Sequence, residues 1–260
     1  MDGITQIEKN ITEIRGRIEA AAARGGRDAK AVTLLAATKT RTPAEMAAAV
    51  FAGVPDLGEN RVQEYEAKIA EVQHLVETGE NSQKKPNIKW HFIGHLQRNK
   101  VKYIIKSVNL IHSVDRAELA EEIQARAVQA NRRVRVLIEV NPAGETQKSG
   151  VPFGGAEGLA LSVSERFSAI EVAGLMAVVP ISDDPEEVRP WFRQMRELFE
   201  GMSDRHGPAG DGLLPAFTEL SMGMTQDYEV AVEEGATIVR VGTGIFGARV
   251  YSPEQMEETR

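Results

Sequence analysis

Strand-like and helix-like segments alternate eight times along this chain of 260 residues, and no other feature of the sequence restricts the fold as strongly. Short apolar runs bounded by polar residues indicate buried strands. Strands separated by helices are typical of a parallel sheet. Eight such units in about 230 residues match a closed α/β barrel, the (β/α)₈ or TIM barrel. We expect strands near residues 32–37, 54–58, 90–94, 110–114, 135–140, 170–176, 217–220 and 237–241.

The composition shows no break that would divide the chain, so we expect one domain over residues 1–260. The alternative is an open, doubly wound sheet. That fold favours a glycine-rich phosphate turn after its first strand, whereas residues 38–41 of this chain, Thr-Lys-Thr-Arg, contain no glycine. The barrel is therefore the favoured architecture.

An extra helix is predicted in front of the barrel, over about residues 3–24. Isoleucines recur three and four positions apart there and form one apolar stripe. A stripe of barely two heptads is short for a coiled coil, so we expect it to pack against the barrel. Gly25 and Gly26 would end the helix. The stripe consists of Ile4, Ile7, Ile11, Ile14 and Ile18.

The overall composition argues against several classes of function. The net charge of −7 disfavours a nucleic-acid or anionic-membrane partner. The chain contains no cysteine, which excludes disulfides, thiolate metal sites and cysteine nucleophiles. Its first residues lack the features of a signal peptide, and no apolar run reaches the length of a membrane span. We therefore expect a cytoplasmic protein.

Lys39 is the first candidate for chemistry because it stands at the exit of the first predicted strand. Side chains alternate between the faces of a strand, so Lys39 should share a face with Leu35 and Ala37. In a partly dry site a lysine can lose its proton near neutral pH and attack a carbonyl carbon. The alternative is a surface lysine just past a strand, as most lysines are.

The loops after the seventh and eighth predicted strands carry glycines and hydroxyls. They are residues 221–225, Ser-Met-Gly-Met-Thr, and residues 242–244, Gly-Thr-Gly. Barrel active sites lie at the C-terminal ends of the strands, and phosphate sites commonly use these two loops. Glycines let backbone N–H groups approach an anion. The pattern predicts a site for an organic phosphate, with plain turn chemistry as the alternative.

Arg240 lies inside the eighth predicted strand, on the same face as Ile238 and Gly242. An arginine in an apolar strand needs a partner. That partner is either a core carboxylate, such as Glu139 or Glu219, or a bound ligand.

The histidines do not indicate a metal site. His91 and His95 flank the end of the third strand and His112 lies in the fourth, a spacing that matches no helical ligand motif. We expect supporting or core roles for them. Asn60 is interpreted as the cap of the following helix, at the barrel mouth where a cap can also touch a ligand.

A strand-end lysine, a phosphate site and a strand-eight arginine together suit pyridoxal 5′-phosphate (PLP). Lys39 would hold the aldehyde carbon as a Schiff base, and the two loops would hold the phosphate. Arg240 would donate to the pyridine nitrogen, which would stay unprotonated because a guanidinium has no acceptor. A PLP-free Schiff-base aldolase also explains Lys39 and the loops, but it leaves Arg240 without a task.

Six short motifs, in this order, resemble the pyridoxal phosphate homeostasis protein family, which is related to the barrel domain of alanine racemases. The resemblance covers nearly the whole chain. The motifs are residues 37–40 (ATKT), 58–64 (GENRVQE), 90–97 (WHFIGHLQ), 148–150 (KSG), 220–224 (LSMGM) and 239–242 (VRVG).

The resemblance implies a PLP-binding barrel of the type III fold, like the alanine racemase N-terminal domain. It also implies control of free PLP and amino-acid balance without dedicated catalytic turnover. Partners would be PLP-dependent apo-enzymes and small amino acids, and the protein would be a monomer. The cofactor-binding residues that follow are Lys39, Asn60, Ser221, Met222, Arg240, Gly242 and Thr243.

Two features depart from the relatives. The family lysine is often preceded by serine, whereas Thr38 stands here. Alanine racemases add a second β-domain and a catalytic tyrosine from a partner subunit, and we expect neither in this chain. The alternative function is a PLP-dependent racemase or lyase with weak activity on a small amino acid.

Overall fold

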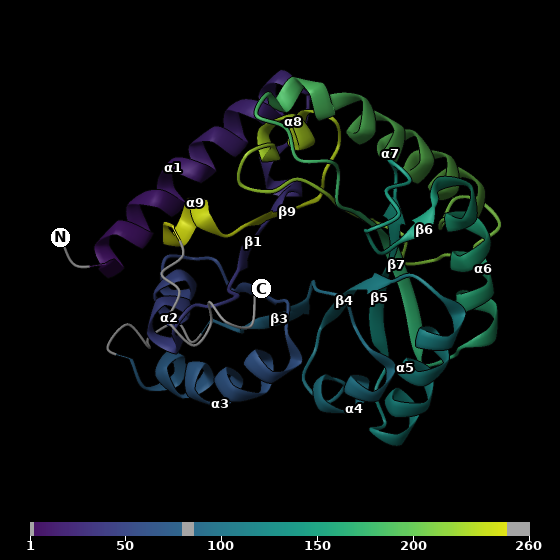
Figure 1. The fold of residues 1–260 in the computed structure, drawn as a ribbon, viewed down its shortest axis with the longest axis horizontal. Coiled ribbons are helices and arrows are strands. Elements are labelled where there is room, and N and C mark those ends of the chain that lie inside the picture. Colours follow the sequence, from purple (N-terminus) through teal and green to yellow (C-terminus); the bar gives the residue numbers. More distant parts are fainter. Residues whose placement is uncertain (1–2, 80–85, 249–260) are drawn as a thin grey trace.

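Eight parallel strands close into a barrel in the computed structural model, which describes residues 3–79 and 86–248 (Figure 1). Neighbouring strands pair in chain order, β1 pairs with β9, and β4 also pairs with β5, which completes the ring. The barrel prediction is confirmed, and the open sheet is wrong because both of its edges are paired. The strands are β1 (Thr33–Ala37), β2 (Asp56–Glu59), β3 (Lys89–Phe92), β4 (Leu110–Val114), β5 (Val134–Asn141), β7 (Ile170–Ala177), β8 (Glu219–Ser221) and β9 (Ile238–Val241), and the short β6 (Val151–Pro152) pairs with β5.

Helices surround the strands as an outer ring (Figure 1). Their starts follow local sequence signals: Thr42 and Glu45 form a capping box at the start of α2, with Pro43 at its first position. The helices are α2 (Pro43–Phe51), α3 (Val62–Thr78), α4 (Val101–Ile104), α5 (Ala117–Gln129), α6 (Ala156–Arg166), α7 (Pro185–His206), α8 (Tyr228–Glu233) and α9 (Thr243–Phe246), with short 3₁₀ turns at Ala29–Ala31, Arg98–Lys100 and Phe153–Gly155. Within these residues no helix is long and apolar enough to cross a membrane.

Helix α1 (Gly3–Arg24) lies outside the barrel and packs against it as predicted. Four isoleucines of its stripe are buried, from Ile7 to Ile18, but Ile4 is 46% exposed. Asn10 Nδ2 donates to the carbonyl of Ile245, 2.8 Å away, so the helix also holds the segment that follows β9. The N-terminal helix therefore ties the first and last parts of the barrel together.

The barrel interior has its own small apolar core, separate from the larger core between strands and helices. Leu35 of β1 and Ile238 of β9 belong to it. Leu35 stands opposite Arg240 in the parallel pairing of these two strands. Because faces alternate along a strand, Lys39 and Arg240 both emerge on the interior side, above this core. The inner-core residues are Leu35, Leu110, Leu137, Ala173, Met176 and Ile238.

Candidate functional site at the barrel mouth

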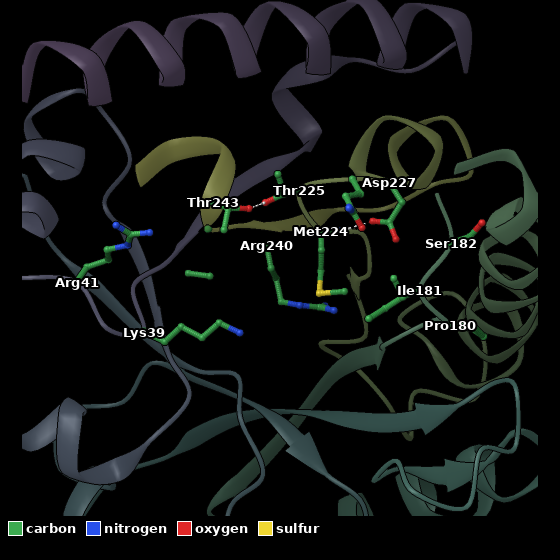
Figure 2. A pocket seen from close by; sticks show the side chains of 13 residues that line it. Lys39, Arg41, Pro180, Ile181, Ser182, Met224, Thr225, Asp227, Arg240 and Thr243 are labelled. Carbon is green, nitrogen blue, oxygen red and sulfur yellow. Dashed lines mark hydrogen bonds between the residues drawn. The ribbon is translucent and has the colours of Figure 1, made fainter. Parts of the chain in front are cut away.

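A cavity of about 250 Å³ opens at the C-terminal ends of the strands, lined by segments that follow β1, β7, β8 and β9. Lys39, Arg240, Gly242 and Thr243 line it, so four of the seven residues predicted from the sequence meet in one place. Figure 2 shows the side chains of Lys39 and Arg240 extending toward the same space. The other three predicted residues, Asn60, Ser221 and Met222, are not on its lining.

Lys39 is half-buried, and both of its neighbours in the chain are fixed by carboxylates. Thr38 Oγ1 donates to Glu59 Oε1, 2.7 Å away, and its side chain is fully buried. Thr40 has a positive φ of 65°, and its N–H donates to Glu64 Oε2 at 2.7 Å. A left-handed threonine is unfavourable unless its surroundings hold it. The Lys39 segment is therefore a supported bend rather than a loose strand end.

Lys68 of α3 joins these two carboxylates. Its Nζ lies 3.1 Å from Glu59 Oε1 and 2.7 Å from Glu64 Oε2. Burial raises the pKa of Glu59, while the charge of Lys68 and the hydroxyl of Thr38 oppose that rise. The shared ammonium keeps two nearby carboxylates together beneath Lys39.

Arg240 is buried and is held by groups of β7 and β8. Its Nη1 donates to the carbonyl and to Oγ of Ser221, at 2.9 and 2.7 Å, and its Nη2 donates to the carbonyl of Ala177 at 2.9 Å. Burial lowers the pKa of Arg240 to about 10, against the charges of Asp227 and Glu139. The side chain therefore stays a cation at neutral pH. It can offer hydrogen-bond donors, but no acceptor, to a ligand in the cavity.

The core-carboxylate alternative for Arg240 is not what the structure shows. Among the described residues, no carboxylate oxygen lies within 4.0 Å of its guanidinium, and Glu219 pairs instead with Arg135 at 3.1 Å. Glu139 acts on Arg240 only through its charge. Burial raises the pKa of Glu139 to about 7, with Asp115 adding to the effect and Arg240 and Arg116 opposing it.

Ser221 supports the site from the barrel interior, and Met222 packs in the outer core. The Ser221 hydroxyl is fully buried and is engaged by Arg240 and by His112 Nδ1, 3.0 Å away. Met222 is fully buried in the outer core, and its N–H donates to the carbonyl of Ile238 at 3.1 Å. The Ser221 hydroxyl is thus engaged beneath the cavity, on Arg240 and His112.

The loops after β8 and β9 meet at two hydroxyls. Thr243 Oγ1 lies 3.2 Å from Thr225 Oγ1 (Figure 2). The N–H of Gly244 donates to Thr225 Oγ1 at 3.4 Å. Gly223 has φ +90°, and a Cβ there would lie 2.5 Å from Cβ of Ala231. The first loop therefore needs glycine both for its backbone conformation and for its close packing.

Asn60 does not cap the next helix, so that interpretation is wrong. The N-cap of α3 is Arg61, which makes no side-chain cap bond. Asn60 Oδ1 is buried and has no hydrogen-bond partner among the described residues. Its backbone packs so closely on Gly94 that a Cβ there would lie 2.1 Å from the carbonyl oxygen of Asn60. A buried amide oxygen without a partner, just past the end of β2, is a group that a ligand can satisfy.

Sequence reasoning missed part of the lining. Residues 180–182 follow β7 and line the cavity, as does Arg41, which follows β1. Asp227 also lines it, and its carboxylate accepts the N–H of Met224. Burial raises the pKa of Asp227, against that hydrogen bond and the charge of Arg240. The signal that could have found residues 180–182 is their place after a strand's C-terminal end.

The histidines take buried or peripheral places. His91 and His112 lie inside the barrel, while His95 Nδ1 lies 3.1 Å from Ser149 Oγ near the mouth. Across residues 3–79 and 86–248 no group of three or more histidine, aspartate or glutamate side chains is arranged to hold a metal ion.

Comparison with known proteins gives consistent results. Residues 5–250 match the family described as alanine racemase, N-terminal domain. The chain is 42% identical over 243 residues to a pyridoxal phosphate homeostasis protein of Aquifex aeolicus, covering 94% of this chain and 98% of that one.

Solved structures agree with this match. PipY of Synechococcus elongatus, in a structure with PLP bound, is 30% identical with a TM-score of 0.75, covering 93% of this chain and all of that one. Alanine racemase from Streptomyces coelicolor shares the fold at 17% identity and a TM-score of 0.62, over 95% of this chain but 59% of the racemase. With an alanine racemase N-terminal barrel, a lysine and an arginine facing one cavity and full-length relatives, this chain belongs to the pyridoxal phosphate homeostasis protein family.

Proposed function

We propose that this chain binds PLP in the mouth cavity, as a Schiff base on Lys39, and serves intracellular PLP and amino-acid homeostasis in the cytoplasm without dedicated catalytic turnover. The observation that carries the proposal is the meeting of Lys39 and Arg240 in one cavity beside two glycine-rich loops. The relatives' names and the PLP-bound PipY structure support it.

The residues present fit this cofactor. Lys39 supplies an amine, and Arg240 keeps guanidinium hydrogens in addition to the three hydrogen bonds described. The unpartnered Oδ1 of Asn60 lies just past β2 and can accept from a ligand hydroxyl or bound water. When bound, PLP supplies an electrophilic aldehyde and a ring that withdraws electrons. Arg240 would meet its ring nitrogen as a donor.

The phosphate is assigned to the loops after β8 and β9. Thr225 and Thr243 bring two hydroxyls within 3.2 Å of each other, and Gly242 leaves the backbone open beside them. A Cβ at Gly242 would lie 3.2 Å from the carbonyl oxygen of Ala37, so a larger residue would narrow the cavity. Ser221 holds Arg240 from beneath, and the N–H of Met222 ties the start of the first loop to β9.

The proposed lack of turnover rests on what faces the cofactor. Enzymes that use the PLP ring as a full electron sink place a carboxylate beside its nitrogen. Arg240 can only donate there. Among the described lining residues there is no tyrosine or histidine to act as a second acid or base opposite Lys39.

One observation favours the alternative, a weak amino-acid racemase or lyase. Asp227 lines the cavity and burial raises its pKa, which suits a group that exchanges protons. Its carboxylate is already engaged by the N–H of Met224, so we rank this function second.

The partners follow from the same proposal. They are PLP itself, PLP-dependent apo-enzymes that receive it, and small amino acids that compete with Lys39 for it. We propose that residues 1–260 form one PLP-binding domain that acts as a monomer and binds neither nucleic acid nor membranes.

A visible absorption spectrum of the purified protein, before and after borohydride, tests the assignment. We expect a band of bound PLP that borohydride removes, with the label mapping to Lys39 after proteolysis. Lys39→Ala should lose the trapped adduct, whereas Lys100→Ala should keep it. A label on Lys148 or Lys100 would show that the cofactor is held elsewhere.

A further inference from the structure

A line of buried polar side chains crosses the barrel interior beneath the mouth cavity. Asp56 Oδ1 lies 3.1 Å from His91 Nε2, and His91 Nδ1 lies 2.9 Å from His112 Nε2. His112 Nδ1 lies 3.0 Å from Ser221 Oγ, which accepts from Arg240 Nη1 at 2.7 Å. All five residues are at most 7% exposed. These hydrogen bonds connect Arg240 on β9 with side chains from four other strands, β2, β3, β4 and β8.

The two ends of this chain of hydrogen bonds face opposite ends of the barrel. Arg240 lines the mouth cavity (Figure 2). Asp56 begins β2 and lines a second cavity of about 300 Å³, which also includes Thr33 at the start of β1. The side chain of Lys89 is 55% exposed, and its Nζ lies 3.8 Å from Asp56 Oδ1. The carboxylate end is therefore near solvent, and the guanidinium end is at the proposed cofactor site.

With one proton on each ring, the chemistry of the two end groups fixes the direction of every bond between them. A guanidinium only donates, so Ser221 Oγ accepts from Arg240 and its own hydrogen points to His112 Nδ1. His112 must then carry its proton on Nε2 and donate to His91 Nδ1. His91 in turn carries its proton on Nε2 and donates to the Asp56 carboxylate, which only accepts.

The opposite direction leaves groups unsatisfied. If His112 carried its proton on Nδ1, Ser221 Oγ would receive two donors, and its own hydrogen would have no other partner among the described residues. A neutral His91 would then turn a bare Nε2 toward Asp56 at 3.1 Å. Burial holds the pKa of His112 well below its usual range, and the charge of Arg240 adds to the effect, so this ring stays neutral. Buried polar groups left without partners are costly.

We propose that His91 and His112 are positioning residues that transmit hydrogen-bond direction from Asp56 to Ser221 and thereby hold Arg240 as a donor in the cavity. The connection to PLP rests on the proposed function, but the direction of the chain does not. Each ring carries its proton on Nε2 because Asp56 accepts at one end and Arg240 donates at the other. With the Ser221 hydrogen held toward His112, the lone pairs of Ser221 Oγ are left to Arg240 alone, which keeps the guanidinium in its orientation.

The first test reads the tautomers directly, without any substitution in the chain of hydrogen bonds. The protein has five histidines, and His74, His95 and His206 lie outside the chain. Replacing these three with glutamine leaves two rings, whose ¹⁵N–¹H correlation spectrum distinguishes the tautomers. We expect Nε2–H, neutral, for both rings in the PLP-free protein at pH 7. An Nδ1–H tautomer or a protonated ring at either position would overturn the proposal.

The second test changes Asp56, the group at the end far from the cavity that can only accept a hydrogen bond. Asp56→Asn keeps the shape, but its amide can also donate to His91 Nε2, so the direction is no longer imposed. We expect mixed tautomers, a shifted absorption maximum of bound PLP and an affinity for PLP lower by about three- to tenfold, roughly one net hydrogen bond. Tyr65→Phe is the control, because it removes a buried hydrogen bond to Ser107 away from the chain.

The outcomes separate the two proposals. Unchanged tautomers and an unchanged absorption maximum in Asp56→Asn would overturn the positioning role, as would an equal shift in Tyr65→Phe. Failure of the wild-type protein to bind PLP would overturn the proposed function. The tautomer measurement uses the PLP-free protein, so it would still test the direction of the hydrogen bonds.

Discussion

Lys68 Nζ lies 3.1 Å from Oε1 of Glu59, a carboxylate whose side chain is completely buried, while the lysine side chain is 13% exposed. Without the lysine, the Glu59 carboxylate keeps its hydrogen bond from the Thr38 hydroxyl but loses its opposite charge. We expect Lys68→Met to lower the free energy of unfolding by about 3–5 kcal/mol, the usual result of breaking a buried pair on one side. Urea unfolding at pH 7 measures it.

A more exposed pair provides the control. Arg126 pairs with Glu122 one turn away on α5, where the two side chains are 36% and 20% exposed, and Arg126→Met should cost less than about 1 kcal/mol. Adding Glu59→Gln to Lys68→Met should recover part of the loss, because the buried charge of Glu59 is then removed as well. Equal losses for the two single variants would argue against the pair as a support of the Lys39 segment.

The two hydroxyls at the end of the barrel give a prediction about ligand selectivity. Thr225 and Thr243 meet at 3.2 Å on the loops assigned to phosphate. Replacing both with valine should weaken PLP by about tenfold or more, as expected for two hydrogen bonds to a charged group, and should hardly affect pyridoxal, which lacks the phosphate. Equilibrium dialysis with both ligands makes the comparison. An equal loss of affinity for PLP and for pyridoxal would show that these loops do not bind the phosphate.

Glu139 makes the stability of the protein depend on pH. Its pKa is about 7 in the folded protein against 4.5 for the ordinary side chain, so its protonated form favours the fold. That stability is complete below about pH 4.5 and is lost as the pH rises through about 7. We expect Glu139→Gln to unfold at higher urea than the wild type at pH 8, by up to about 3 kcal/mol. The gap should close toward pH 4.5, and a gap independent of pH would refute the assignment.

Proton exchange at an amino acid decides between the two candidate functions. If Arg240 donates to the ring nitrogen as proposed, a negative charge at the α-carbon of an amino acid would gain little delocalisation. We expect the PLP-loaded protein to exchange the α-proton of L-alanine slowly or not at all in deuterated water, followed by NMR, and to form no D-alanine. Rapid exchange that is lost in both Lys39→Ala and Asp227→Asn would promote the enzyme alternative.

The sequence was sufficient for features that depend on neighbours in the chain. Alternation along a strand is a local property, so the interior face of Lys39 and Arg240 could be predicted from Leu35 and Ile238 alone. The barrel followed from eight local alternations, and its closure from their number.

The remaining features depend on distances across the barrel, which no spacing along the chain reports. Ser221 was predicted at the phosphate, but β4 brings His112 to 3.0 Å from its hydroxyl, on the interior side. Asn60 was predicted as a cap from a statistical preference, and α3 instead begins with Arg61 as its cap residue. Asp227 escaped notice because only the folded loop turns it toward the cavity.

The pairing of β1 with β9 has a consequence for how the protein is made. Lys39 follows the first strand and Arg240 lies in the last. They therefore come together only when β1 pairs with β9, the two strands of the barrel that lie farthest apart in the sequence. Contacts of such high sequence separation form late, since their entropy must be lost before they stabilise anything. During synthesis, the amine emerges roughly two hundred residues before the guanidinium, about ten seconds or more at ribosomal speeds. A ligand that needs both groups would therefore bind only chains in which the barrel has closed. By mass action, its binding would stabilise the pairing of the first and last strands.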